Sequence, residues 1–203
     1  MEDIYIEDTN NKDAIDLILK YHYSHRLPSI PMIVLTQYRE EQAIACIVFN
    51  IPATRWSEPV LELGRLVRRE ETNPKPILTK LISYGLKSCK GKGYDLVISY
   101  ADSTFNHHGG IYQAASWNFH QLRKPQHDGW IIDGEFTPRR TCYNRWGASG
   151  EKLKEILKGH TLQKHYDKGK YLYWKSLNKQ GNQKAKRLKL QSIQYPKPTM
   201  LYK

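Results

Sequence analysis

The middle of the sequence constrains the fold more than any other part. The run at 60–67, VLELGRLV, is apolar and β-branched and predicts a strand, and a helix over 77–89 starts after two prolines. The GKG segment at 91–93 ends this helix, and a second apolar run follows at 94–100. A strand, a crossover helix and a second strand form a βαβ unit. We therefore predict a parallel pair of strands at the centre of the fold.

The flanking segments extend this unit into a larger sheet. The other predicted elements are strands at 3–6, 31–38, 43–51, 119–123, 130–133 and 171–177, and helices at about 10–23, 111–117 and 151–158. We expect the α/β (α+β) class, with a mixed twisted central sheet flanked by helices. We also expect one catalytic domain over 1–177 and a basic C-terminal tail over 178–203.

Polar side chains directly follow the apolar run at 96–98, within and just after the predicted strand at 94–100. They are Ser99, Tyr100, Asp102, Ser103, Asn106, His107 and His108. Burying such groups without partners costs about 1–3 kcal/mol each, so they are poor core material. Ligands of open α/β sheets bind beyond the carboxyl ends of strands. We therefore place the candidate site at this strand end, where Gly109-Gly110 begins the next helix.

The end of the first predicted helix has two interpretations. His22, Tyr23, Ser24, His25 and Arg26 crowd this end. A polar helix terminus is one interpretation, because the helix dipole favours histidine there. One wall of the site is the other.

The net charge of +12 predicts an anionic partner. Lysine and arginine are concentrated after residue 177, where the chain carries no acid. A solvated tail would have the same composition, but a basic folded part favours nucleic acid. The DNA contacts we expect are Lys184, Lys186, Arg187 and Lys189.

Composition argues against a membrane or secreted protein. No stretch reaches the roughly 20 apolar residues of a membrane span, and the acidic N-terminus lacks a signal-peptide pattern. The three cysteines form no CxxC pair and suit a reducing cytosol, with each thiol in the core or at a neutral surface.

The order of the elements resembles the GNAT-type N-acyltransferase fold. In that superfamily the turn between the fourth strand and the next helix holds the pyrophosphate of coenzyme A. The resemblance implies an acyl-CoA-type donor, with Arg65, Arg68 and Lys75 as candidates to bind it. The turn lacks the glycine-rich sequence of a phosphate loop, so its charge is the main indication.

A tyrosine in the helix after the next strand often protonates the leaving thiolate in GNAT enzymes. Ile111-Tyr112 followed by Trp117 and Phe119 resembles that pattern. The resemblance implies Tyr112 as the acid, although a tyrosine at such a position is more often part of the core.

Several motifs together resemble the Mom family of bacteriophage DNA-modification proteins. They are HYS at 22–24, ELGRL at 62–66, SYAD through IYQAASWNF at 99–119, KHYDKGKYLYW at 164–174 and YPK at 195–197. The resemblance implies that adenine's exocyclic amine in double-stranded DNA becomes a methylcarbamoyl derivative, which shields phage DNA from restriction in the host cytoplasm. The chain departs from the family in its doubled histidine at 107–108 and in lacking a compact KHRY-like motif.

The chemistry of adenine suggests a role for each candidate residue. Adenine's amine is a poor nucleophile, so a transferase must position it, accept its proton and activate the donor. The candidate catalytic residues are Asp102 to accept the proton, Tyr112 as the acid, Ser99 to orient the donor, Arg65 for anionic charge, and His22 and Tyr23 to complete the pocket. A base in duplex DNA must be extruded, and Trp117, Trp130 or Trp146 would then stack on it unless they belong to the core.

A metal site is a secondary expectation. His22, His25, His107, His108 and Asp102 include the imidazoles and carboxylate of an iron-type facial set, with His22, His108 and Asp102 as the main candidates. Histidines far apart in sequence often fit such a description by chance.

Two other functions remain open at this point. One is a GNAT-type acetyltransferase acting on a protein or a small amine, and the other is a non-catalytic DNA-binding module. The basic tail and the block at 99–119 favour DNA modification over both. A homodimer is compatible with the sequence, which does not indicate an oligomeric state.

Overall fold

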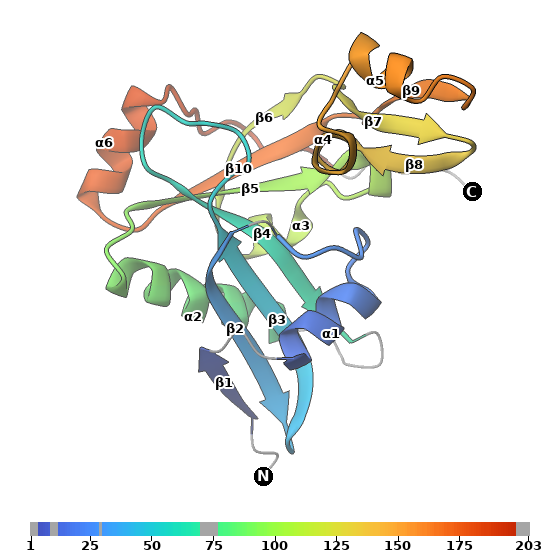
Figure 1. Cartoon of the computed structure of the whole chain (residues 1–203). Coiled ribbons are helices and arrows are strands. Elements are labelled where there is room, and N and C mark those ends of the chain that lie inside the picture. Colours follow the sequence, from blue (N-terminus) through green and yellow to red (C-terminus); the bar gives the residue numbers. More distant parts are fainter. Residues whose placement is uncertain (1–3, 9–11, 29, 70–76, 198–203) are drawn as a thin grey trace. The chain divides into compact units, whose positions relative to one another are not determined.

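A computed structural model describes residues 4–8, 12–28, 30–69 and 77–197 of the chain (Figure 1). Contacts divide the chain into two compact units. Unit 1 comprises 1–101, 107–121 and 171–203, and unit 2 comprises 102–106 and 122–170. This division differs from the expected boundary at 177, because the C-terminal segment belongs to the same unit as the N-terminal half.

A seven-stranded mixed sheet has the order β1-β2-β3-β4-β5-β10-β6. Its strands are β1 Ile4–Asp8, β2 Pro31–Arg39, β3 Gln42–Asn50, β4 Leu61–Arg68, β5 Leu96–Asp102, β6 Asn118–Arg123 and β10 Lys170–Ser176. The first four strands are antiparallel neighbours, whereas β4 and β5 are parallel. The predicted βαβ unit is therefore confirmed, and so is the mixed sheet flanked by helices.

Two helices cover opposite faces of the N-terminal half of the sheet (Figure 1). Successive side chains of a strand point to opposite faces. Val34 of β2 packs in one core cluster with α1 (Lys12–Tyr21), and its neighbour Leu35 packs in another with α2 (Ile77–Gly91). This alternation buries β2 and β3 on both sides and fixes the position of β4.

The β4–β5 pair separates soon after it begins. Residues 61–63 of β4 pair with 97–99 of β5, and no pairing follows among the described residues of the two strands. The β3–β4 register also shifts at Gly64, which is an extra residue on β4. The main-chain groups of β4 from Gly64 onward therefore face a fork between the two strands.

The basic segment after residue 177 contains a folded helix of unit 1. Helix α6 spans Lys179–Arg187, and the side chain of Asn178 accepts a hydrogen bond from the Gly181 amide at 2.8 Å. Gly181 and Ala185 are buried, and a Cβ on Gly181 would overlap the carbonyl of Asp95. This face of the helix therefore packs against the rest of unit 1.

Unit 2 has a small antiparallel sheet of its own, in the order β8-β7-β9. Its elements are η1 Ser103–Phe105, β7 His127–Ile132, β8 Glu135–Pro138, α4 Arg139–Trp146, α5 Glu151–Ile156 and β9 Leu162–Tyr166. The sequence predicted β7 and α5 but not β8, α4 or β9. A core cluster around Trp130, Cys142 and Leu153 holds the two helices against the sheet.

The short helix α3 (Gly110–Ala114) completes unit 1. All three cysteines are buried free thiols, as the sequence indicated. Within the described residues, no helix is both long enough and apolar enough to span a membrane.

Candidate functional site

The hydroxyl groups of Ser99 and Tyr112 form a buried pair in unit 1. Ser99 is on β5, one residue after the buried Ile98, and Tyr112 is in the first turn of α3. The two oxygens lie 2.7 Å apart, and Ser99 Oγ also lies 2.7 Å from the Leu63 carbonyl oxygen. This pair lies where β4 and β5 separate, since Leu63 and Ser99 are the last register partners.

The number of available protons decides which hydroxyl of this pair donates. Ser99 has one hydroxyl proton, and the Leu63 carbonyl only accepts. When Ser99 donates to Leu63, its oxygen accepts the proton of Tyr112. Burial raises the pKa of Tyr112 well above its usual range, while Ser99 acts in the opposite direction. Tyr112 is therefore a protonated phenol at neutral pH, as an acid requires.

Aromatic rings and a short hydrogen-bond chain fix the start of α3. The Tyr112 ring packs at 5.3 Å from Trp117 and at 5.2 Å from Tyr173 of β10. The Tyr173 hydroxyl donates to the His108 carbonyl at 2.6 Å and accepts from the side-chain amide nitrogen (Nε2) of Gln113 at 3.0 Å. The strand β10 thus sets the position of the helix that carries the candidate acid.

Gly109 is required for this packing. Its φ of 85° is in the left-handed region that favours glycine, and a Cβ there would overlap the Tyr173 ring. The paired glycines noted in the sequence therefore allow close approach of Tyr173 as well as a turn.

The exit of α1 is the second part of the site in unit 1. His22 is buried, and its Nδ1 accepts from the Ser24 amide at 3.1 Å, with Ser24 Oγ at 2.8 Å. Because a main-chain amide only donates, Nδ1 carries no proton and the neutral ring carries it on Nε2. Burial, followed by the charges of Arg65 and His107, lowers the pKa of His22 to about 3. His22 is therefore a neutral donor through Nε2–H at physiological pH.

Aromatic contacts connect this exit to the loop before α3. The Tyr23 ring centroid lies 4.3 Å from that of His22, with the two rings tilted, and 5.1 Å from that of His107 in an edge-on contact. The residues of the HYS motif therefore contact the loop that leads to Tyr112.

Arg65 holds the α1 exit against β4. Its Nε donates to the Arg26 carbonyl at 2.7 Å, and Nη1 donates to the Gly64 carbonyl at 2.6 Å. The guanidinium thus has two main-chain partners, which limits it as a phosphate ligand. Positioning the segment at 22–26 is the role that its contacts indicate.

The fork between β4 and β5 contains an unpaired buried atom. A Cβ on Gly64 would overlap Asn50 Oδ1, and this oxygen is buried without a hydrogen-bond partner among the described residues. Such an atom is unusual, since most buried acceptors are satisfied. Neither Gly64 nor Asn50 was singled out from the sequence, where each is an ordinary residue in an apolar run.

The expected donor-binding cations are only partly described. Arg68 donates to the Arg69 carbonyl at 2.8 Å, and Arg69 donates to the Ala43 carbonyl at 2.7 Å. Both are half-buried at the end of β4. Lys75 lies outside the described residues.

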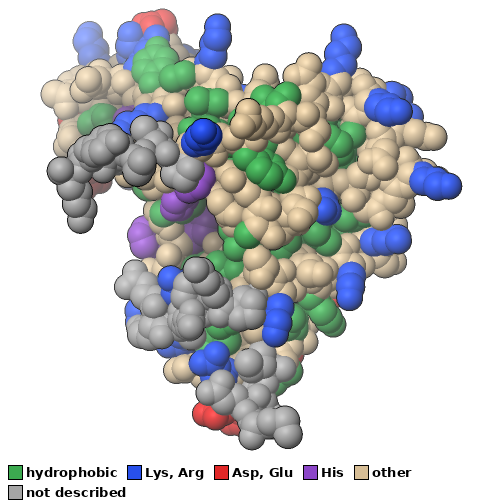
Figure 2. Space-filling model, turned by 180° about the vertical axis from the view of Figure 1, so that it is seen from behind, with side chains coloured by type: hydrophobic (Ala, Val, Ile, Leu, Met, Phe, Trp, Pro, Cys, Tyr) green, Lys and Arg blue, Asp and Glu red, His purple; other side chains and the backbone are tan. Residues whose placement is uncertain are grey.

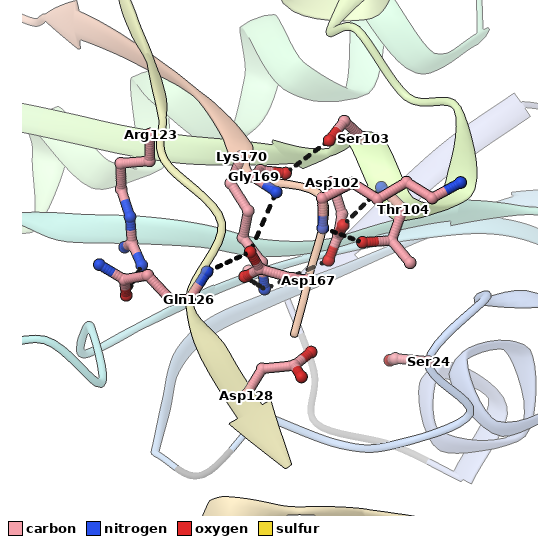
Figure 3. Close-up of polar contacts among 12 residues, drawn as sticks. Ser24, Asp102, Ser103, Thr104, Arg123, Gln126, Asp128, Asp167, Gly169 and Lys170 are labelled. Atoms are coloured by element: carbon pink, nitrogen blue, oxygen red, sulfur yellow. Dashed lines mark hydrogen bonds and ion pairs between the residues drawn. The ribbon is translucent and has the colours of Figure 1, made fainter. Parts of the chain in front are cut away.

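Asp102 is part of a polar cluster in unit 2 (Figure 3). Its Oδ1 accepts from the Thr104 amide at 3.0 Å and so caps η1, and its Oδ2 lies 3.2 Å from Lys170 Nζ. Asp167 lies 3.9 Å from the same ammonium and accepts from the amides of Gln126 and Gly169. Both carboxylates are buried, and Lys170 lies between them.

Sequence reasoning missed Asp167 and Lys170. The pattern Asp167-Lys168-Gly169 was the available signal, since Asp side chains commonly accept from an amide two residues on. The partner Asp102 is far away in sequence, so only the fold relates the two acids. Ser99 and Tyr112 are in unit 1.

The structure does not support a metal site. No group of three or more His, Cys, Asp or Glu suited to a metal ion occurs among the described residues. His22 uses Nδ1 for Ser24, and Asp102 pairs with Lys170. The candidate set of His22, His108 and Asp102 is therefore not an iron-type triad here.

Two of the three tryptophans proposed for base stacking belong to cores. Trp117 and Trp130 are 0% and 1% exposed, so neither presents a face to a base. Trp146 is half-buried, with the Arg145 guanidinium 4.9 Å from its ring.

Lysine and arginine dominate the face shown in Figure 2, where acidic side chains are few. Two of the expected DNA contacts have acidic partners in unit 1: Lys184 lies 2.7 Å from Asp95, and Arg187 lies 2.5 Å from Glu58. Lys186 and Lys189 are exposed. Of the four expected DNA contacts, Lys184 and Arg187 are therefore held in ion pairs, whereas Lys186 and Lys189 are exposed.

Solved structures with a similar fold are acetyltransferases. They include ribosomal-protein-S18-alanine N-acetyltransferase of Escherichia coli, at 6% identity over 87% of this chain and 95% of that chain, with a TM-score of 0.53. A GNAT family acetyltransferase of Elizabethkingia anophelis with acetyl-CoA bound is 12% identical over 86% of this chain and 97% of that chain, with a TM-score of 0.51. An acetyltransferase of Bacillus subtilis in complex with CoA is 13% identical over 88% of this chain and 100% of that chain, with a TM-score of 0.50.

Sequence comparisons complete this assignment. A search of curated proteins finds no match. The model of the Mom protein family matches residues 3–197, which is nearly the whole chain. The fold is that of GNAT acetyltransferases, as expected, and the chain belongs to the Mom protein family.

Proposed function

We propose that the protein is a DNA-modifying transferase. It transfers an acyl-type group, the methylcarbamoyl group of a thiocarbamate carried on the sulfur of a coenzyme A-type donor, to the exocyclic amine of adenine in double-stranded DNA, and the product protects the DNA from restriction. The observation that carries the proposal is the buried Ser99–Tyr112 pair at the β4–β5 fork of a Mom family chain. Two structures of similar fold contain CoA or acetyl-CoA, which supports the choice of donor.

The fork suits an extended, amide-containing donor. Beyond Leu63, the described part of β4 has no β5 partner, so main-chain groups on this edge that bond neither to β3 nor to Arg65 are open to an added extended chain. The unsatisfied Asn50 Oδ1 beside Gly64 is a further acceptor in this region. The positive charges of Arg68, Arg69 and Lys75 follow in sequence and would attract the phosphates of the donor.

The reaction forms a bond between adenine N6 and the acyl carbon and breaks the carbon–sulfur bond. The Tyr112 hydroxyl gives its proton to the leaving sulfur, which its raised pKa permits because the phenol is protonated beforehand. The proton that the amine loses passes to solvent water. Ser99 holds the Tyr112 hydroxyl, and the Nε2–H of His22 supplies a neutral donor for developing negative charge.

The decisive experiment is to express the protein in a bacterium, digest the cellular DNA to nucleosides and weigh them. We expect a new adenosine mass with the wild-type chain and none with Tyr112→Phe. If the nucleosides are unchanged while acetylated protein or small amine accumulates, the protein is an acetyltransferase of another class. If the nucleosides are unchanged and the chain only binds DNA, it is not an enzyme of this kind.

A further inference from the structure

Helix α4 of unit 2 has a basic, exposed face that the fold does not use. The helix spans Arg139–Trp146 and contains three arginines and no acid. Its only buried residue is Cys142, which packs with Trp130 and Leu153. None of the ion pairs found in the described part of the chain involves an arginine of this helix. These arginines are therefore not explained by the packing of unit 2.

Helical geometry gathers the polar side chains on one outward face. Residues four apart lie above one another on a helix, so Arg140 and Asn144 form one row. Tyr143 lies beside that row and is 60% exposed. Cys142 points to the opposite side, where its Sγ lies 3.7 Å from the Thr137 carbonyl. The outward row is thus polar and cationic along the length of the helix.

The side chains of this row match the chemistry of DNA bases. Arginine pairs with guanine through O6 and N7, and asparagine pairs with adenine through N6 and N7 in the major groove. The groove admits an α-helix, and eight residues span about 12 Å, which is the width of the groove. Arg139 and Arg145, at the two ends of the helix, are placed to reach phosphates on either side.

The end of α4 is fixed, as a reading element requires. Gly147 has a φ of 63° and its amide donates to the Tyr143 carbonyl at 2.8 Å, which closes the last turn. The Arg145 guanidinium lies over the Trp146 ring at 4.9 Å. A helix held in this way presents its outward row with little loss of entropy on binding.

We propose that α4 is the DNA-reading helix of this protein. Arg140 and Asn144 contact base edges in the major groove, and Arg139 and Arg145 contact the flanking phosphates. The inference rests on the proposed function, because it names the surface by which the DNA substrate is held and its sequence context selected. Specificity then comes from unit 2, while the acid Tyr112 belongs to unit 1.

The test measures binding of the full chain to duplex DNA without donor. Bound duplexes are selected from a random pool and sequenced, and affinity is measured by fluorescence anisotropy over a range of salt. We expect Arg140→Ala and Asn144→Ala each to lower affinity for the selected duplex about tenfold and to relax one position of the selected sequence. Arg145→Gln is expected to leave the sequence unchanged and to reduce the salt slope by about one.

The variant Arg140→Lys separates the charge of Arg140 from its pairing with a base. Lysine keeps the charge but lacks the planar fork that pairs with guanine at two atoms. We therefore expect the affinity for random DNA to be kept and the sequence preference at one position to be weakened. All these positions are exposed, so thermal unfolding of the variants should match that of the wild type.

Lys152→Ala on α5 is the matched control, because this lysine is exposed in the same unit and loses the same charge. Equal losses in Lys152→Ala and Arg140→Ala would overturn the proposal, and so would a wild-type sequence preference in Arg140→Ala and Asn144→Ala. Equal affinity for double-stranded RNA would also overturn it, because the major groove of RNA is too narrow for a helix. Loss of base modification with DNA binding intact would count against the proposed chemistry alone.

Discussion

The buried polar groups around Ser99 and His22 in unit 1 differ from those around Lys170 in unit 2. The first set is neutral: the hydroxyls of Ser99 and Tyr112, and the His22 ring with its proton on Nε2. Unit 2 keeps charged groups in pairs, such as Lys170 between two carboxylates. Burying a neutral hydrogen-bonded group costs much less than burying an ion. Neutral groups suit proton donation, whereas the ion pairs of unit 2 fix the loops that carry them.

The largest expected effect tests the neutral side of this comparison. Tyr112→Phe keeps the ring packed on Trp117 and Tyr173 but removes the proton that the leaving group needs. We expect base modification to fall by about 10²–10⁴-fold, with a stability loss of only about 1 kcal/mol. Nucleoside mass analysis and thermal unfolding measure the two quantities. Modification at the wild-type rate would remove Tyr112 from the chemistry.

The next effect tests the charged side. Lys170→Met leaves Asp102 and Asp167 without their shared cation, and both are buried. Breaking such a pair costs about 3–5 kcal/mol when it is fully buried, so we expect about half of that here because Lys170 is partly exposed. Denaturant unfolding of the variant provides the measurement.

Removing a carboxylate together with the cation isolates this effect. The double variant Lys170→Met with Asp167→Asn is the control, and it should recover part of the lost stability because one uncompensated charge is gone. A single variant as stable as the wild type would mean that the ion pairs do not stabilise unit 2.

A third effect tests the β4 bulge. Gly64→Ala places a Cβ against Asn50 Oδ1, so something in the fork must shift. We expect a stability loss of about 1–3 kcal/mol and weaker donor binding. Adding Asn50→Ala should restore most of the stability, because the overlapping atom is removed. If Gly64→Ala alone binds CoA and unfolds like the wild type, the fork is not as closely packed as described.

The last effect concerns pH and His22. The pKa of His22 falls from about 6.5 in the unfolded chain to about 3 in the fold, so the unfolded state binds the extra proton between these values. Stability from this residue is complete above pH 6.5 and declines toward pH 3, by up to about 1.4 kcal/mol per pH unit.

His22→Asn removes this titration, because the Asn oxygen still accepts from the Ser24 amide but does not ionise in this range. Urea unfolding between pH 4 and 7 should therefore give a shallower pH dependence for the variant. Parallel curves for the two proteins would show that His22 is not buried in its neutral form.

The sequence predicted unit 1 much better than unit 2. The βαβ unit and α1 follow from apolar periodicity and from proline and glycine at element ends, which are local signals. In unit 2 the strands are short, and α4 has three arginines and a single buried residue, so its sequence has no stripe of apolar residues at helical spacing. Hydrophobic periodicity therefore could not predict α4.

The candidate site was predicted only where it is local. The block at 99–119 contains both Ser99 and Tyr112, and the fold brings them into contact. Asp102, three residues after Ser99, has Thr104 and Lys170 as partners. Lys170 is far away in sequence, so only the fold brings it close to Asp102. Patterns along a sequence report periodicity and spacing, whereas ion partners, close packing and tautomers are set by tertiary contacts.

The place of β10 in the sheet has a consequence for synthesis of the protein. This strand lies between β5 and β6, although it is synthesised after all the other strands in the described part of the chain. Its Tyr173 supports the loop before α3, so a nascent chain that stops short of it lacks the support of the candidate acid. Translation products that end before Tyr173 should therefore lack a positioned candidate acid.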